Sequence, residues 1–91
     1  MGSLAYEQRA VFRHLHLHLS RLLADVSGVT FSATAHQAIR LAVWNLAYTG
    51  NEKRAVASMC DIPPLEFPRF VLTFPKVVGT AHDEWRASDH S

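Results

Sequence analysis

The pattern of apolar and polar positions predicts a chain built from helices. The clearest helical pattern runs from Ser32 to Tyr48, where apolar residues recur at every third or fourth position. One apolar arc of this segment consists of Ala35, Ala38, Ile39, Ala42, Val43 and Leu46. A second arc on the far side consists of Leu41, Trp44 and Tyr48. Because a helix that is apolar on two sides is usually buried on two sides, we expect this segment to be the central helix of a small bundle.

Two further helices are bounded by local signals. Residues 4–26 carry an amphipathic pattern that predicts a first long helix, and Gly28 stands where glycine commonly closes a helix. Gly50 is expected to end the central helix in the same way. Asn51 can cap a third helix from Glu52 to Met59, because its side chain can accept a hydrogen bond from the first turn.

A fourth helix is expected in the mainly apolar segment 65–78, which contains prolines. Proline is tolerated in the first turn of a helix but disrupts its interior. We therefore expect a short helix that begins near Pro64 or Pro68 and ends or kinks at Pro75. A strand over 70–74 is the alternative.

The predicted elements form one helical domain followed by a tail. Residues 4–79 are expected to fold as a compact all-α bundle of about four helices around the central helix. Residues 80–91 are small, polar and charged, so they are expected to form a polar C-terminal tail. Trp85 is the exception in this tail, and it either folds back on the bundle or contacts a partner.

The composition predicts association with another protein. Hydrophobic residues make up 48% of the 91 residues, and charged residues make up 19%, below the usual ~25%. A domain of this size buries only about 60% of the surface of its unfolded chain, so its core cannot easily hide all of this apolar material. We expect a homo-oligomer, for example an intertwined dimer, or docking on another protein. The interface candidates, chosen as large apolar side chains, are Leu17, Trp44, Tyr48 and Trp85.

Charge and cysteine content favour an intracellular protein, either cytoplasmic or nuclear. The formal net charge of +1 demands neither nucleic acid nor an anionic membrane as a partner. No apolar run approaches the ~20 residues of a membrane-spanning helix, and no N-terminal targeting signal is present. The single cysteine, Cys60, cannot form an intrachain disulfide, which suits a reducing compartment.

Histidine is the residue type that most suggests a chemical site. His14 and His18 are four residues apart, so both could reach one metal ion from a helix, and His16 lies between them. The ligand set is incomplete, so we favour a solvated helix face and predict no metal or other cofactor. A response of the three histidines to pH is a further interpretation. Cys60 is interpreted as a core residue, and without a nucleophile beside a base the chain is predicted to be non-enzymatic.

The segment from Arg54 to Arg69 resembles a helix-turn-helix motif. Ala57 stands at the packed position of its first helix, and residues 60–62 stand at its turn. The resemblance implies a second helix that enters the DNA major groove. The alternative function is therefore a nucleic-acid-binding regulator that uses residues 54–76 or, in a histone-like dimer, the basic face of the first helix. The candidate nucleic-acid-binding residues are Arg9, Arg13, Arg54, Arg69 and Lys76.

The order of predicted elements is also similar to the histone fold. A first helix, a short Val-Thr-Phe-Ser connector and a long helix from Ala33 precede a final helix, and the span from Arg13 to Gly79 has a similar length. The FSATAHQAI stretch is similar to the start of the central histone helix. The resemblance implies an obligate dimer, which would cover the surplus of apolar surface.

Overall fold

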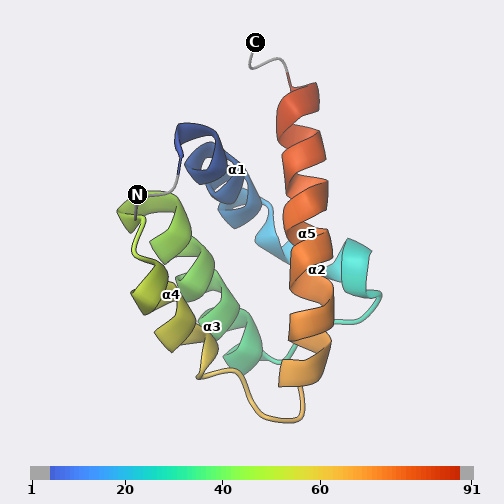
Figure 1. Cartoon of the computed structure of the whole chain (residues 1–91). Helices are drawn as coiled ribbons and strands as arrows, with labels where there is room; N and C mark the ends of the chain where they lie inside the picture. Colours follow the sequence, from blue (N-terminus) through green and yellow to red (C-terminus); the bar gives the residue numbers. More distant parts are fainter. Residues whose placement is uncertain (1–4, 89–91) are drawn as a thin grey trace.

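The chain forms five α-helices and one π-helical turn in the computed structural model, which describes residues 5–88 (Figure 1). In chain order the elements are α1 (Tyr6–Leu17), α2 (Leu19–Ser27), α3 (Ala33–Trp44), the π-helical turn η1 (Asn45–Thr49), α4 (Glu52–Met59) and α5 (Phe67–Ala87). No strand occurs within the described residues, and segment 70–74 is helical. The predicted all-α class is confirmed.

The helices pack around α3 and α5. Helices α3 and α4 lie side by side, and α5 runs along the length of the molecule in Figure 1. Helix α1 packs against α5, α3 and η1, whereas α2 packs mainly against α5. The radius of gyration is 12.6 Å, close to the ~12 Å expected for a compact domain of this length. The chain is therefore compact, and its surplus of apolar side chains does not result from an open or extended shape.

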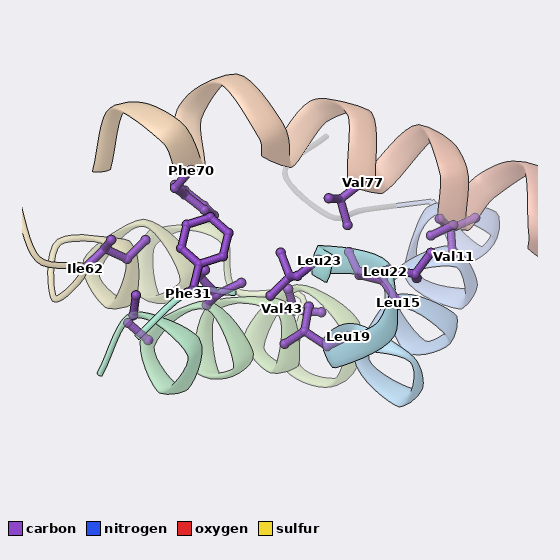
Figure 2. Close-up of a cluster of buried hydrophobic side chains, with 14 residues drawn as sticks. Val11, Leu15, Leu19, Leu22, Leu23, Phe31, Val43, Ile62, Phe70 and Val77 are labelled. Atoms are coloured by element: carbon purple, nitrogen blue, oxygen red, sulfur yellow. The ribbon is translucent and has the colours of Figure 1, made fainter. Parts of the chain in front are cut away.

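The core lies between α5 and the helices on its inner side. Figure 2 shows Phe70 and Val77 pointing from α5 toward Phe31, Leu23 and Val43. The largest side chains that are almost wholly buried are Leu15, Leu19, Leu22, Ile39, Val43 and Val77. Full burial of a side chain of this kind contributes about 1.5–3 kcal/mol. A smaller cluster of Ala42, Leu46 and Ala55 joins α4 to the central helix.

The first long helix is divided at His18, so its prediction as one continuous helix over 4–26 is wrong. The backbone of His18 has φ −116° and ψ 23°, outside the helical range, and it separates α1 from α2. The break redirects α2, whose Leu19, Leu22 and Leu23 are buried where α2 packs against α5. Gly28, with φ 74°, closes α2 as predicted.

The central helix begins and ends where the sequence predicts. Ser32 caps it by accepting a hydrogen bond from the N–H of Ala35 at 3.2 Å, and Gly50 ends it with φ 65°. The π-helical last turn was not predicted. In this turn the Gly50 N–H donates to the carbonyl of Asn45, while the Asn45 side chain donates to the carbonyl of Leu41 at 3.0 Å. The chain then reverses into α4, so the similarity to histones does not extend to one unbroken central helix.

Helix α4 has its predicted bounds, but α5 is much longer than predicted. Asn51 caps α4 by accepting a hydrogen bond from the N–H of Arg54 at 3.0 Å. Helix α5 has Pro68 in its first turn, as expected, but it continues through Pro75. Pro75 is exposed, so the carbonyl that loses its helical donor can be solvated by water.

The polar tail predicted for residues 80–91 is wrong as far as Ala87, where α5 ends. Ala81 is fully buried and Trp85 packs against the core, so they continue the buried face of α5 at the four-residue spacing set by Val77. Trp85 therefore folds back on the bundle. Residues 89–91 of the predicted tail and residue 4 of the predicted domain lie outside the described residues.

Candidate interaction surface

An exposed ridge of large apolar side chains runs along the outer side of the central helix. Leu41 and Trp44 lie on α3 and Tyr48 lies on η1, at the three- and four-residue spacing of one helix face. Trp44 is 42% exposed and Tyr48 is 40% exposed, and their ring centroids are 5.9 Å apart. We call these three residues the aromatic ridge. Burial on two sides, which was expected for this segment, is found on one side only within residues 5–88, because the second arc is exposed.

Arg9 of α1 holds the end of the ridge in place. Its side chain donates hydrogen bonds to the carbonyls of Ala47 at 3.4 Å and Tyr48 at 2.7 Å. These carbonyls belong to the last turn of the helix, where backbone acceptors lack helical partners and a cation is favourable. Arg9, a candidate for nucleic-acid binding, is thus engaged with the chain's own backbone.

The side chain of His16 on α1 lies at the Tyr48 end of the ridge. The ring of His16 meets the ring of Tyr48 edge to face, with centroids 5.7 Å apart. Burial lowers the pKa of His16 below 6.5, and the charge of Arg40 lowers this pKa further. Leu17, the next residue, is 73% exposed, in agreement with its predicted position outside the core.

Two hollows flank the aromatic ridge. One, of about 390 Å³, is lined by His16, Gln37 and Arg40 together with Leu41 and Trp44. The other, of about 300 Å³, lies toward α4, and its lining also includes Leu41 and Trp44. The remaining residues of the second hollow are Asn45, Arg54, Ala57, Ser58 and Asp61. The ridge therefore separates two hollows, each of which contains one arginine.

A second exposed apolar surface lies on the side of α5 that faces away from the core. Leu65, just before the helix, is 97% exposed, and Leu72 is 72% exposed. Pro68, Pro75 and Gly79 are exposed along the same side of the helix, which is opposite the buried residues. We call Leu65, Pro68, Leu72, Pro75 and Gly79 the outer face of α5. A surface helix normally carries polar residues on this side.

A third hollow is lined by polar side chains that are already engaged within the chain. It is a groove of about 520 Å³ between α1 and α5, with Phe12 and Val78 among its apolar lining residues. Of its polar lining residues, Glu7 and His82 form an ion pair at 2.9 Å, and Gln8 accepts a hydrogen bond from the backbone of Ala5. The groove is therefore a weaker candidate for a specific binding site than the aromatic ridge.

The histidines make separate contacts. His14 Nε2 lies 2.9 Å from Glu84 Oε1, and the ring centroids of His14 and His18 are 4.6 Å apart. His16 turns instead toward Tyr48. Among residues 5–88, no group of three or more histidine, cysteine, aspartate or glutamate side chains is arranged to hold a metal ion.

The basic residues assigned to nucleic acid are dispersed. Arg69 lies 4.2 Å above the ring of Phe31, just before the central helix, and also pairs with Glu66 at 3.6 Å. Arg9 lies at the other end, beside Tyr48. These ends are 17 residues apart along the chain, which corresponds to about 25 Å along a helix. The structure therefore does not bring Arg9 and Arg69 together.

The other three candidates have different surroundings. The guanidinium of Arg13 lies 6.0 Å from the ring centroid of Tyr6. Arg54 is exposed and lines a hollow beside the aromatic ridge, and Lys76 is exposed on α5. Of the candidate basic residues, Arg54 alone is placed next to Trp44.

Residues 54–76 do not form a helix-turn-helix motif, so that structural prediction is wrong. The connection between α4 and α5 spans residues 60–66, whereas the motif uses a turn of three or four residues. Helix α4 packs against α3 and η1, and α5 packs against α1 and α2. Two adjacent prolines at 63 and 64 delay the start of α5, which explains the long connection.

Cys60 and Trp85 differ from each other in burial. Cys60 is exposed as a free thiol beyond the end of α4, so its interpretation as a core residue is wrong. Its backbone at the cap is still helical, and a spacing of five residues from the buried Ala55 places Cys60 on the outer side of α4. Trp85 packs against the core, and its ring stacks on His82 with centroids 6.5 Å apart. Trp85 is therefore a weaker interface candidate than Trp44.

Comparison with known proteins assigns no family. No protein-family model matches the chain, and neither the curated proteins nor the solved structures contain a significant match to it. Within the described residues, no helix is both long enough and apolar enough to span a membrane.

Proposed function

We propose that the protein is a non-enzymatic helical interaction module that binds a partner protein through the aromatic ridge and a second copy of itself through the outer face of α5. The observation that carries this proposal is the exposure of Leu41, Trp44 and Tyr48 as one ridge. These side chains remain exposed although the chain has filled its core. Exposed contiguous apolar surfaces commonly mark protein interaction sites.

The outer face of α5 supports the self-association part of the proposal. Leu72 lies between Leu65 and Gly79, seven residues from each, so the face extends about 10 Å along the helix on either side of it. Two copies of one helix face can pack about a twofold axis, because every contact then occurs twice. Gly79 leaves open space where a side chain would stand, and Leu72 of a second copy could occupy such space.

Nucleic-acid binding is the alternative function, and it receives less support. Phosphate contacts require lysine and arginine side chains that are available to the backbone of the nucleic acid. Arg9 is bonded to backbone carbonyls, and Arg69 stacks on Phe31 and pairs with Glu66. A dimer could still bring further cations together, so the salt dependence of any duplex binding tests this alternative.

An intracellular location is part of the proposal. The exposed thiol of Cys60 would be open to oxidation and to intermolecular disulfide formation outside the cell. A cytoplasmic or nuclear compartment keeps such thiols reduced.

Absolute mass in solution tests the self-association part. Light scattering on a sizing column should give about twice the 10.2 kDa of one chain, and the fraction of dimer should rise with protein concentration. The buffer should contain a reductant, so that a disulfide through Cys60 does not imitate the dimer. A constant monomer mass up to millimolar concentration would contradict self-association and leave the ridge as the interaction surface to test.

A further inference from the structure

We propose that the aromatic ridge binds an acidic amphipathic helix of a different protein. The apolar side chains of this helix would enter the two hollows, and its carboxylates would pair with Arg40 and Arg54. The inference rests on the proposed function, because it names the kind of partner for one of the two surfaces.

The shape of the site suits a helix. Leu41 and Trp44 line both hollows, so they form a raised edge between two depressions. An amphipathic helix presents apolar side chains at three- and four-residue intervals on a stripe wider than one residue. Such side chains can straddle the edge and enter the depressions on both sides. Trp44 would become fully buried, as is common for tryptophan at the centre of an interface.

The charge of the site selects an acidic partner. Arg40 lines one hollow and Arg54 lines the other. No ion pair involves either arginine within residues 5–88, and Arg40 makes only a long hydrogen bond, 3.5 Å, to the hydroxyl of Ser20. The positive charge of Arg40 acts on this surface, because it helps to lower the pKa values of His16 and His36. Asp61 also lines the hollow of Arg54, so the two hollows carry two cations and one anion. The remaining positive charge beside an apolar ridge complements a helix with flanking carboxylates.

A second copy of this chain is a poor occupant for the ridge. Three of its glutamates are already engaged within the chain: Glu7 pairs with His82, Glu66 with Arg69, and Glu84 with Arg21. The outer face of α5, its most exposed apolar helix face, carries Lys76 beside it. That lysine would approach Arg40 or Arg54 with a like charge.

Single-stranded nucleic acid is the competing occupant, because aromatic rings with nearby arginines also stack bases. Two features favour the acidic helix. Leu41 is an aliphatic side chain that offers no stacking surface. Two arginines are also few for a phosphate backbone, whose affinity grows with the number of cations it meets.

Two matched peptides test the proposal directly. Both form a helix with leucines at every third or fourth position, and they differ in having either glutamates or lysines beside the leucine stripe. We expect the glutamate peptide to bind about tenfold more tightly in fluorescence anisotropy at moderate salt, since two charge pairs form in one case and repel in the other. A labelled oligo-thymidine serves as the nucleic-acid probe.

Three variants of the full chain assign the binding to the ridge. Trp44→Ala should abolish binding of the glutamate peptide, and Arg54→Glu should remove or reverse the preference between the two peptides. Lys76→Glu, at an exposed position on α5, is the matched charge-reversal control and should leave the preference unchanged. Circular dichroism of each variant shows that it is folded.

The outcomes separate this inference from the proposed function. Equal affinity for both peptides, or tighter binding of the oligo-thymidine, would overturn the acidic-helix proposal. If neither peptide binds but the chain forms a dimer, the inference is overturned and the interaction module stands. If neither peptide binds and the chain is a monomer, both fail.

Discussion

Glu84 joins three helices through one carboxylate. From α5 it accepts hydrogen bonds from Arg21 of α2, at 2.7 Å, and it lies 2.9 Å from Nε2 of His14 on α1. These hydrogen bonds lower the pKa of Glu84 from its usual 4.5 to about 2, with Arg21 the largest cause. A carboxyl whose pKa is lower in the folded state stabilises the fold above its unfolded pKa. This stabilisation is present above pH 4.5 and is lost as the pH falls toward 2.

Replacing Glu84 with glutamine should reduce stability at neutral pH and weaken its acid dependence. We expect Glu84→Gln to lower the free energy of unfolding at pH 7 by roughly 1 kcal/mol, because the carboxylate is partly exposed and screened by water. The difference from the natural chain should shrink between pH 4.5 and pH 2. Asp83→Asn, at the neighbouring exposed position, is the control. A difference that stays constant across this pH range would show that the carboxylate charge is not the cause.

We predict that the hydrogen bonds of Arg9 stabilise the aromatic ridge and the whole fold. Arg9→Met keeps much of the apolar length of the side chain but removes its donors to the carbonyls of Ala47 and Tyr48. We expect a loss of about 1–2 kcal/mol in urea unfolding, since hydrogen bonds from charged groups are worth more than neutral ones. Arg13→Met is the matched control on the same helix, because the Arg13 guanidinium lies 6.0 Å from the ring centroid of Tyr6 and donates to no backbone carbonyl within residues 5–88. If both variants lose the same stability, the carbonyl contacts of Arg9 are not the reason.

The two prolines of α5 should respond to substitution with opposite signs. Pro75 is inside the helix, where proline is about 3 kcal/mol less favourable than alanine, so Pro75→Ala should raise stability by roughly 1–3 kcal/mol. Pro68 lies in the first turn, where proline is favourable, and Pro68→Ala should lower stability by about 0.5 kcal/mol through the freer unfolded chain. Thermal unfolding followed by circular dichroism measures both. A loss of stability in Pro75→Ala would mean that its ring contributes packing that exceeds the missing hydrogen bond.

Element boundaries were predictable where a local signal determines them. Gly28 and Gly50 close helices with positive φ, and Ser32 and Asn51 cap the helices that follow them. The break at His18 could not be predicted in the same way. The break depends on the packing of α2 against α5, and α5 begins some 40 residues after α2 ends.

The end of α5 was predicted wrongly because burial outweighed the local sequence signals. Pro75 suggested an end and residues 80–91 looked polar, but Val77, Ala81 and Trp85 continue one buried stripe. Packing of such a stripe outweighs the local cost of one proline. For the surface, helical phase correctly placed Trp44 and Tyr48 on a second arc. Helical phase could not reveal the hydrogen bonds of Arg9, because their carbonyl acceptors lie 38 and 39 positions further along the chain.

At the scale of the whole molecule, the apolar surplus affects stability through protein concentration, because it is proposed to be buried in a dimer. If the outer face of α5 pairs in a dimer, the dimer is stabilised by mass action, and the melting temperature rises with protein concentration. Leu72 belongs to this face and is 72% exposed. Leu72→Glu places a charge at the centre of the proposed interface, where two copies would bring two carboxylates together.

We therefore expect Leu72→Glu to be a monomer whose melting temperature is independent of concentration. Val56→Glu, which replaces another exposed apolar residue on α4, is the matched control and should still dimerise. Both substitutions remove one apolar side chain and add one negative charge, so a change in net charge alone affects them equally. Dimerisation that Val56→Glu abolishes and Leu72→Glu retains would move the interface from α5 to α4. Loss of the dimer in Leu72→Glu alone supports the outer face, because only the site of the charge differs between the variants.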